Sequence, residues 1–280
     1  MKYLGKIIIA VICCIVIFLI YKYRQTIFKP RDLQPLIKYG EKLLQKPKSL
    51  AIVISKYNED IRWLTSKFMI THLHNIRSLN HPIRINLYLY LKGNKPLDVT
   101  FKNKLYDYYN NIHIEKLKNV GMCDQTYLYH IAKNYDRLED VTFFIPGSAN
   151  NKIKINLLDS LMNNGYKYSY YFTYVRKEYF LPYYQSSGYI VTEKKNQTKE
   201  NTNFEVSDVR PFGNWYTYYT KQELSTYDTN HKGIFSLSRQ TIKKLPLYFY
   251  ESMNNLLSKY VNSEDCHYME RMWYPLLTHF

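Results

Sequence analysis

Four polar residues stand together directly after an apolar run in the segment SLAIVISKYNED, residues 49–60. They are Tyr57, Asn58, Glu59 and Asp60. Their hydroxyl, amide and carboxylate groups can hydrogen-bond a ligand or cap a helix. Capping explains one such residue but not the whole cluster, so the group is a candidate binding site.

The elements around this cluster predict where it lies in a fold. Leu50 to Ser55 lacks polar alternation, which indicates a strand buried on both faces, as in a parallel sheet. Ile61 to Leu73 carries apolar residues at roughly helical spacing. Strand, polar turn and helix open an α/β unit, and ligands of open α/β sheets bind outside the carboxyl ends of the strands.

The same alternation continues through the first half of the chain. Strands are predicted at Ile83 to Leu91, Ile112 to Leu117 and Asp140 to Ile145, and a helix at Asp124 to Asn134, with Asp124 as a candidate N-cap. This order predicts an α/β fold of three layers, Rossmann-like, with a mixed sheet flanked by helices.

The second half predicts fewer elements. Gly233 to Leu257 begins as a short strand and continues into helix, with Pro246 near a second helix start. The C-terminal residues from Ser263 predict a helix whose first turn contains Glu264 and Asp265. Lys194 to Asn203 is polar and predicts an exposed loop.

The N-terminal residues predict a membrane anchor. Ile7 to Tyr21 is uninterrupted apolar sequence, and no small-residue cleavage site follows it. We expect a single-pass membrane protein with an anchor at residues 1–25, a stalk at 26–48 and a globular domain at 49–280. Charges on both sides of the anchor, and the sequon at Asn196, leave open which side of the membrane the domain occupies.

The charge and cysteine content limit the classes of partner. The 280 residues carry a net charge of +16, which favours anionic partners. The basic residues are scattered and no zinc-finger spacing exists, so we expect no nucleic-acid binding. Cys123 and Cys266 are far apart in sequence, and both a disulfide between them and two free thiols are open.

Four segments, in their order along the chain, resemble an uncharacterised family found in fungi and large DNA viruses. They are SLAIVISKYNEDIRWL, KNVGMCDQTYLYHIAKNYDRLEDVTFFIPG, GIFSLSRQTIKKLPLYFYESM and HYMERMW. Members of that family are similar to GT-A nucleotide-sugar glycosyltransferases. The resemblance covers about Ser49 to Phe280, and Val120 to Gly147 is its most specific part.

The resemblance implies a GT-A-like fold and a nucleotide-sugar donor, with an unknown glycan or protein as acceptor. It implies that the end of the first strand binds the donor and that the turn after the fourth strand binds its diphosphate. The donor-binding residues would be Tyr57, Asn58, Glu59, Asp60, Gly147, Ser148 and Asn150.

One departure from the GT-A pattern affects the metal. Those enzymes usually place Asp-x-Asp after the fourth strand to hold a divalent cation, Mn²⁺ or Mg²⁺, whereas this chain reads PGSAN at residues 146–150. Without carboxylates a hard cation is poorly bound, so no metal ligand is predicted. Either basic residues replace the metal or the protein is inactive. The basic candidates are Lys152, Lys154, Arg210 and Arg239.

For the acid/base role on the acceptor side, the C-terminal helix offers Glu270 first and Asp265 second. An ion pair of Glu270 with Arg271 or Arg239 is the structural alternative. The sequence therefore predicts a membrane-anchored glycosyltransferase. A non-catalytic binding or structural protein of the same fold, viral in origin, is the first alternative, and a basic module binding anionic glycans or lipids is the second.

Overall fold

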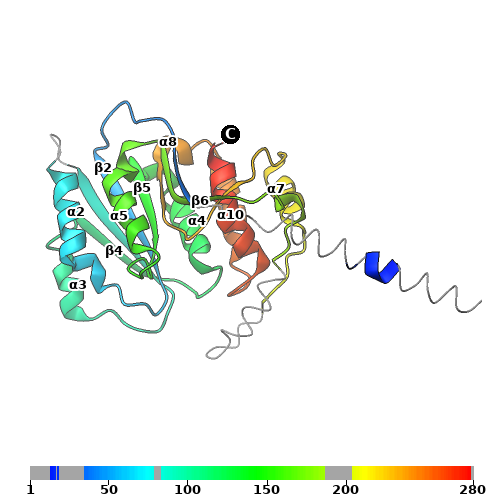
Figure 1. Ribbon diagram of the computed structural model, residues 1–280. Coiled ribbons are helices and arrows are strands. Elements are labelled where there is room, and N and C mark those ends of the chain that lie inside the picture. The colour runs from blue at the N-terminus through cyan, green and yellow to red at the C-terminus, as the bar shows by residue number, and fades with distance from the viewer. Residues whose placement is uncertain (1–12, 17, 19–34, 79–82, 187–203, 279–280) are drawn as a thin grey trace, which may run out of the picture.

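The computed structural model describes residues 13–16, 18, 35–78, 83–186 and 204–278 (Figure 1). In these ranges eight strands form one mixed sheet in the order β1-β6-β8-β5-β2-β3-β4, with β7 paired to β6. The strands are β1 (Leu36–Tyr39), β2 (Ser49–Lys56), β3 (Arg84–Leu91), β4 (Asn111–Lys116), β5 (Val141–Pro146), β6 (Tyr170–Lys177), β7 (Asp228–Asn230) and β8 (Phe235–Ser238).

Strand direction determines which ends of the sheet meet. β4, β3, β2 and β5 run parallel to one another, and β8 is antiparallel to β5. The carboxyl ends of the four parallel strands therefore lie at the same edge as the amino end of β8. We call this edge the carboxyl edge. The four strands predicted in the first half are confirmed as β2, β3, β4 and β5.

Helices cover both faces of the sheet (Figure 1). On one face α2 (Lys67–Arg77), α3 (Val99–Leu105) and α5 (Ile155–Asn164) enclose a core with the side chains of Leu50, Ile52 and Ile54. On the other face α4 (Met122–Asn134), α7 (Phe212–Thr220), α9 (Leu247–Leu257) and α10 (Glu264–Thr278) enclose a second core with Ala51 and Val53. Adjacent β2 residues enter opposite cores, which explains why this strand is apolar throughout.

The predicted three-layer α/β fold with a mixed sheet is thus confirmed. The remaining helices are short: η1 (Arg62–Thr65), η2 (Tyr135–Arg137), η3 (Gly165–Lys167), η4 (Leu181–Tyr183) and α8 (Arg239–Ile242). Several helix starts follow from local sequence. Ser66 caps α2 by accepting from the Met69 N–H at 3.4 Å, and Asp98 caps α3 by accepting from the Phe101 N–H at 2.8 Å.

The predicted N-cap of α4 is wrong. The cap is Gly121, with φ of 60°, and Asp124 lies inside the first turn, where it is only 2% exposed. A glycine adopts this left-handed conformation without a Cβ penalty, so the backbone turns into α4 three residues before the carboxylate. Asp124 is thereby free to make contacts with other parts of the fold.

The predicted boundary between stalk and domain at Ser49 also changes. Leu36–Tyr39 forms β1, which pairs antiparallel with β6, so part of the expected stalk belongs to the sheet. Within the described ranges no helix is long and apolar enough to cross a membrane. The anchor expected at residues 1–25 lies outside those ranges except for residues 13–16 and 18.

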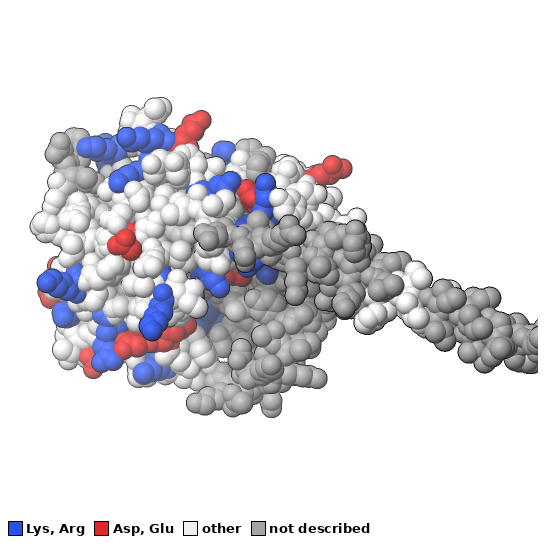
Figure 2. Space-filling model, in the orientation of Figure 1, with Lys and Arg blue, Asp and Glu red and all other residues white. Residues whose placement is uncertain are grey.

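The charged side chains are dispersed on the face seen in Figure 2, where Lys and Arg do not gather into one continuous patch. Cys123 and Cys266 are both free thiols, so the disulfide considered from sequence does not form.

Candidate functional site

The strand ends that the sequence singled out meet at the carboxyl edge. Glu59 Oε2 accepts a hydrogen bond from the Tyr57 N–H at 2.6 Å. A Cβ built on Gly147 would lie 3.0 Å from the same Glu59 oxygen. The Gly147 N–H donates to the Ser55 carbonyl at 2.7 Å, and the Trp63 indole donates to the Gly147 carbonyl at 3.0 Å. The Glu59 carboxylate is therefore fixed beside the turn after β5.

The end of β3 packs tightly on the end of β2. A Cβ on Gly93 would lie 2.3 Å from the Tyr57 carbonyl oxygen and 2.3 Å from Asn58 Oδ1. Only a residue without a side chain allows this approach. Gly93 thereby sets the position of the segment that carries Asn58 and Glu59.

Gly93→Ala is accordingly expected to lower the free energy of unfolding by about 1–3 kcal/mol, because the clash is with the backbone and requires the strand ends to separate. Gly147→Ala is the matched variant, because a Cβ there would lie 3.0 Å from Glu59 Oε2 and 3.2 Å from the Ser55 carbonyl oxygen, a milder overlap than the 2.3 Å at Gly93. We expect Gly147→Ala to lower the free energy of unfolding clearly less than Gly93→Ala does. Urea denaturation of both variants measures the difference, and equal losses would contradict this account.

A cavity of about 430 Å³ opens next to Glu59, between the segments that follow β2 and β3. Its walls include the side chains of Lys56, Glu59, Asp60 and Lys95. Asp60 is held by Arg62, whose Nε lies 2.9 Å from Asp60 Oδ2, and this pairing lowers the pKa of Asp60 to about 2. The cavity thus contains both anionic and cationic groups.

The turn after β5 contains Gly147, Ser148 and Asn150. Ser148 Oγ accepts from Lys154 Nζ at 3.0 Å, and Asn150 is exposed. Lys154 is the residue just before α5, where Asn151 Oδ1 accepts its backbone N–H at 2.9 Å. Of the four basic residues proposed from sequence, Lys154 is therefore brought to this turn.

Glu270 also reaches the carboxyl edge. Its Oε1 accepts the backbone N–H of Lys232 at 2.9 Å, and Lys232 and Gly233 lead into the amino end of β8. A Cβ on Gly233 would lie 3.2 Å from Cys123 Sγ. Glu270 therefore stands near the start of α4, and the Arg271 and Arg239 ion pairs considered from sequence do not engage it in the described structure.

Four charged side chains surround Cys123: Lys92, Asp124, Lys154 and Glu270. The two carboxylates raise the pKa of the Cys123 thiol and the two ammonium groups lower it, but burial dominates and raises it, so the thiol stays protonated. Burial and the neighbouring Glu270 raise the pKa of Asp124 to about 7. Trp273 Nε1 donates to Asp124 Oδ1 at 2.8 Å.

Lys92 was not identified from sequence, and neither was the role of Asp124. Lys92 is 6% exposed, donates to the carbonyls of Val120 and Met122, and has its pKa lowered to about 8 by burial. The one sequence signal was the glycine at residue 121, which permits the turn that aims α4 at this edge. The contacts themselves join residues far apart in the chain, which no local pattern encodes.

The remaining candidates lie elsewhere. Asp265 is 7% exposed and accepts from Ser207 Oγ at 2.6 Å and Trp215 Nε1 at 2.8 Å, so it holds the segment before α7 onto α10. Arg210 pairs with the buried Glu264 at 2.7 Å. Arg239 pairs with Asp140 at 3.0 Å, beyond the opposite edge of the sheet. Lys152 is exposed.

The residues present do not fit a divalent cation. Within the described ranges no group of three or more His, Cys, Asp or Glu side chains could hold a metal ion. The turn at residues 147–150 offers a hydroxyl and an amide, with Glu59 as the neighbouring carboxylate. Hard cations prefer carboxylate oxygens, whereas the charged group that is hydrogen-bonded to this turn is the Lys154 ammonium.

No protein-family model and no curated protein matches the chain. Three solved structures show a distant likeness. Core-mannan synthase A (CmsA/Ktr4) of Aspergillus fumigatus in its Mn/GDP form is 9% identical, with 80% of this chain and 69% of that chain covered and a TM-score of 0.35. Mannosyltransferase PcManGT of Pyrobaculum calidifontis, in complex with GDP-Man and Mn²⁺, is 14% identical, with 84% and 57% covered and a TM-score of 0.31. The S. cerevisiae mannosyltransferase Ktr4p is 10% identical, with 91% and 72% covered and a TM-score of 0.33.

Proposed function

We propose that this chain is a membrane-anchored, GT-A-like glycosyltransferase that moves a sugar from a nucleotide-sugar donor to a glycan or protein acceptor. The observation that carries the proposal is the position of Glu59. Its carboxylate is fixed by the Tyr57 N–H, beside the Gly147 turn and a cavity of about 430 Å³. A carboxylate at the end of a parallel strand is well placed to accept hydrogen bonds from ribose hydroxyls.

The diphosphate of the donor would lie over the turn at residues 147–150. Lys154 stands 3.0 Å from Ser148 Oγ and supplies an ammonium group there. When the bond between the anomeric carbon and the phosphate oxygen breaks, negative charge develops on the leaving diphosphate. A fixed positive charge lowers the free energy of that transition state, so Lys154 takes the part that a metal ion has in related enzymes.

The acceptor would approach from the side of α10. Glu270 is oriented by the Lys232 N–H. It would accept the proton of the acceptor hydroxyl while the oxygen of that hydroxyl bonds to the anomeric carbon. The proton ends on Glu270 and the electron pair of the broken bond ends on the diphosphate. Asp124, the neighbouring carboxyl group, has its pKa raised to about 7 by burial and by Glu270.

Donor binding is tested by thermal stabilisation of the full chain in mild detergent with a panel of nucleoside diphosphates and nucleotide sugars, GDP and GDP-mannose among them. We expect one nucleotide to raise the melting temperature, and EDTA to leave that shift intact. Glu59→Gln keeps an oxygen for the Tyr57 N–H and is expected to weaken binding about tenfold. Glu223→Gln, an exposed carboxylate after α7, is the control.

The alternative is a protein that keeps the fold and has lost catalysis. The observation in its favour is the turn at residues 147–150, which lacks carboxylates, together with the missing group of metal ligands in the described ranges. Absence of any stabilisation across the nucleotide panel would favour this alternative. Stabilisation that EDTA abolishes would instead contradict the assignment of the positive charge to Lys154.

A further inference from the structure

A second cavity, of about 860 Å³, lies along β3 and β4 and extends from Arg84, at the amino end of β3, to Tyr90 and Glu115 near the carboxyl ends of the two strands. We call it the amino-edge pocket, and its lining includes Arg84, Asn86, Tyr88, His113, Arg137 and Glu139. Arg84 is the first residue of β3. At about 3.3 Å per residue, β3 places Arg84 roughly 23 Å from the carboxyl end of the strand. This pocket and the cavity beside Glu59 have no lining residue in common.

The floor of the pocket is polar because of how β3 and β4 alternate. Ile85, Leu87 and Leu89 enter the apolar core on the α2 face. On the α4 face, cross-strand pairing instead aligns Asn86 with Asn111, Tyr88 with His113 and Tyr90 with Glu115. Tyr90 is buried in the apolar core beneath α4, whereas Asn86, Asn111 and His113 make the amino half of this face polar.

The polar groups of the floor are held in fixed positions. Glu139 is 5% exposed, and its Oε1 accepts from Asn86 Nδ2 at 2.7 Å and from Tyr88 OH at 2.8 Å. The rings of Tyr88 and His113 stack with centroids 4.5 Å apart. Glu139 Oε2 is buried and has no hydrogen-bond partner among the described residues. An acceptor in that state favours a hydroxyl donor supplied from outside.

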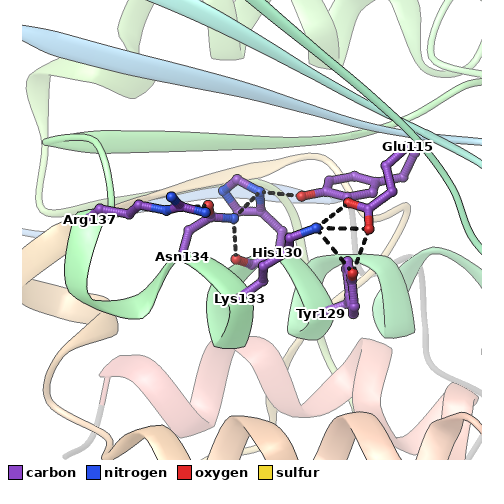
Figure 3. A network of polar contacts seen from close by, with 7 residues as sticks. Glu115, Tyr129, His130, Lys133, Asn134 and Arg137 are labelled. Atoms are coloured by element: carbon purple, nitrogen blue, oxygen red, sulfur yellow. Dashed lines mark hydrogen bonds and ion pairs between the residues drawn. The ribbon is translucent and has the colours of Figure 1, made fainter.

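The wall opposite the floor comes from the end of α4. Figure 3 shows the side chains of His130, Lys133, Asn134 and Arg137 on α4 and just beyond it, lying between the helix and the strands. Lys133 is engaged by Glu115 at 2.8 Å. Arg137 Nε donates to Asn134 Oδ1 at 3.2 Å, which orients the guanidinium without neutralising it.

The exposed side chains of Arg84 and Arg137 also line this pocket. In the described part of the chain neither Arg84 nor Arg137 forms an ion pair with a carboxylate. Both are close enough to the Tyr88 hydroxyl to oppose the rise in its pKa that burial and Glu139 cause. Guanidinium groups bind phosphate and carboxylate oxygens through paired hydrogen bonds.

We propose that the amino-edge pocket binds a sugar that carries an anionic group, either a phosphate or a carboxylate. The hydroxyls would bond the Glu139 carboxylate and the amides of Asn86 and Asn134, and the anionic group would lie between Arg84 and Arg137. The volume is within the range of about 300–1,000 Å³ that small-molecule sites occupy. This proposal does not depend on the proposed glycosyltransferase activity.

The test is isothermal titration calorimetry of the full chain in mild detergent with four probes: glucose 6-phosphate, glucuronate, glucose and inorganic phosphate. We expect at least one of the two charged sugars to bind at least about tenfold more tightly than glucose or phosphate. The stronger of the two charged sugars identifies the anionic group. Binding of neither charged sugar, or equal binding of inorganic phosphate, would overturn the proposal.

Variants locate the binding. Arg84→Ala and Arg137→Ala alter exposed side chains, so the fold should survive, and each is expected to weaken binding about tenfold. Arg137→Lys keeps the charge and should recover part of the loss. Lys102→Ala removes an exposed charge on α3 and should leave the affinity for the charged sugar unchanged. Glu59→Gln should also leave this binding unaltered, which separates it from donor binding. Unchanged affinity in both arginine variants would place the ligand elsewhere.

Discussion

Lys154→Ala is expected to reduce the release of nucleoside diphosphate from the preferred nucleotide sugar by about a hundredfold or more. The ammonium group lies 3.0 Å from Ser148 Oγ, at the turn where the diphosphate would lie. Removing one fixed electrostatic partner of a leaving group typically costs 10²–10³ in rate. The loss should appear in kcat more than in KM, because the charge on the diphosphate increases in the transition state.

Two further variants test whether the loss of rate is due to the charge of Lys154. Lys152→Ala removes an exposed lysine two residues away and serves as the matched control, with a rate close to that of the unmodified chain. Lys154→Arg retains the charge and should retain a measurable share of the activity. If Lys154→Ala released nucleoside diphosphate as fast as Lys152→Ala, the leaving group would be stabilised by something other than Lys154. That result would contradict the metal-independent mechanism proposed for this chain.

The second large effect is the dependence of stability on pH through Asp124. Its pKa is raised from 3.8 to about 7, chiefly by burial and secondly by Glu270. The folded state therefore holds the proton more tightly than the unfolded state between these two values. The contribution of Asp124 is fully present below about pH 4 and is lost as the pH rises toward and through 7.

Asp124→Asn is expected to remove this dependence, because the amide oxygen can still accept from Trp273 Nε1 and no charge is buried. The variant should match the unmodified chain at about pH 4 and below, and exceed it at pH 8 by a few kcal/mol, since each unit of pKa shift corresponds to about 1.4 kcal/mol. Urea denaturation at the two pH values measures this, with exposed Asp107→Asn as control. A variant less stable than the parent at pH 8 would show that Lys92 stabilises the Asp124 carboxylate more than Glu270 and burial oppose it.

The parallel half of the sheet was predictable from sequence because its strands carry their own signals. β2 is apolar throughout, and β5 is a short apolar run that ends at a proline and a glycine. The second half of the chain carries weaker local signals for its strands. β6 is rich in tyrosine and pairs only with residues remote in sequence, and β1 lies in a segment whose prolines indicate a linker. Tertiary pairing, not local propensity, makes these residues strands.

The candidate site divides in the same way. Glu59 and the Gly147 turn were found because each directly follows a predicted strand, and parallel strands bring such ends together. Lys92 and Asp124 were missed because their importance comes from burial and from partners such as Trp273, more than a hundred residues away. Asp265 was chosen for its helix alone, and the structure assigns it to the support of Ser207 and Trp215.

The pairing of β1 with β6 affects how the domain can be isolated. Leu36, Lys38 and Tyr39 cover one backbone edge of β6 over Tyr171 to Val175. A fragment beginning at Ser49 would leave those N–H and C=O groups open on an apolar, tyrosine-rich strand, and open strand edges recruit other chains. Material cut at Ser49 would therefore tend to self-associate for a reason unrelated to any membrane segment, whereas a fragment that begins before Leu36 keeps the edge closed.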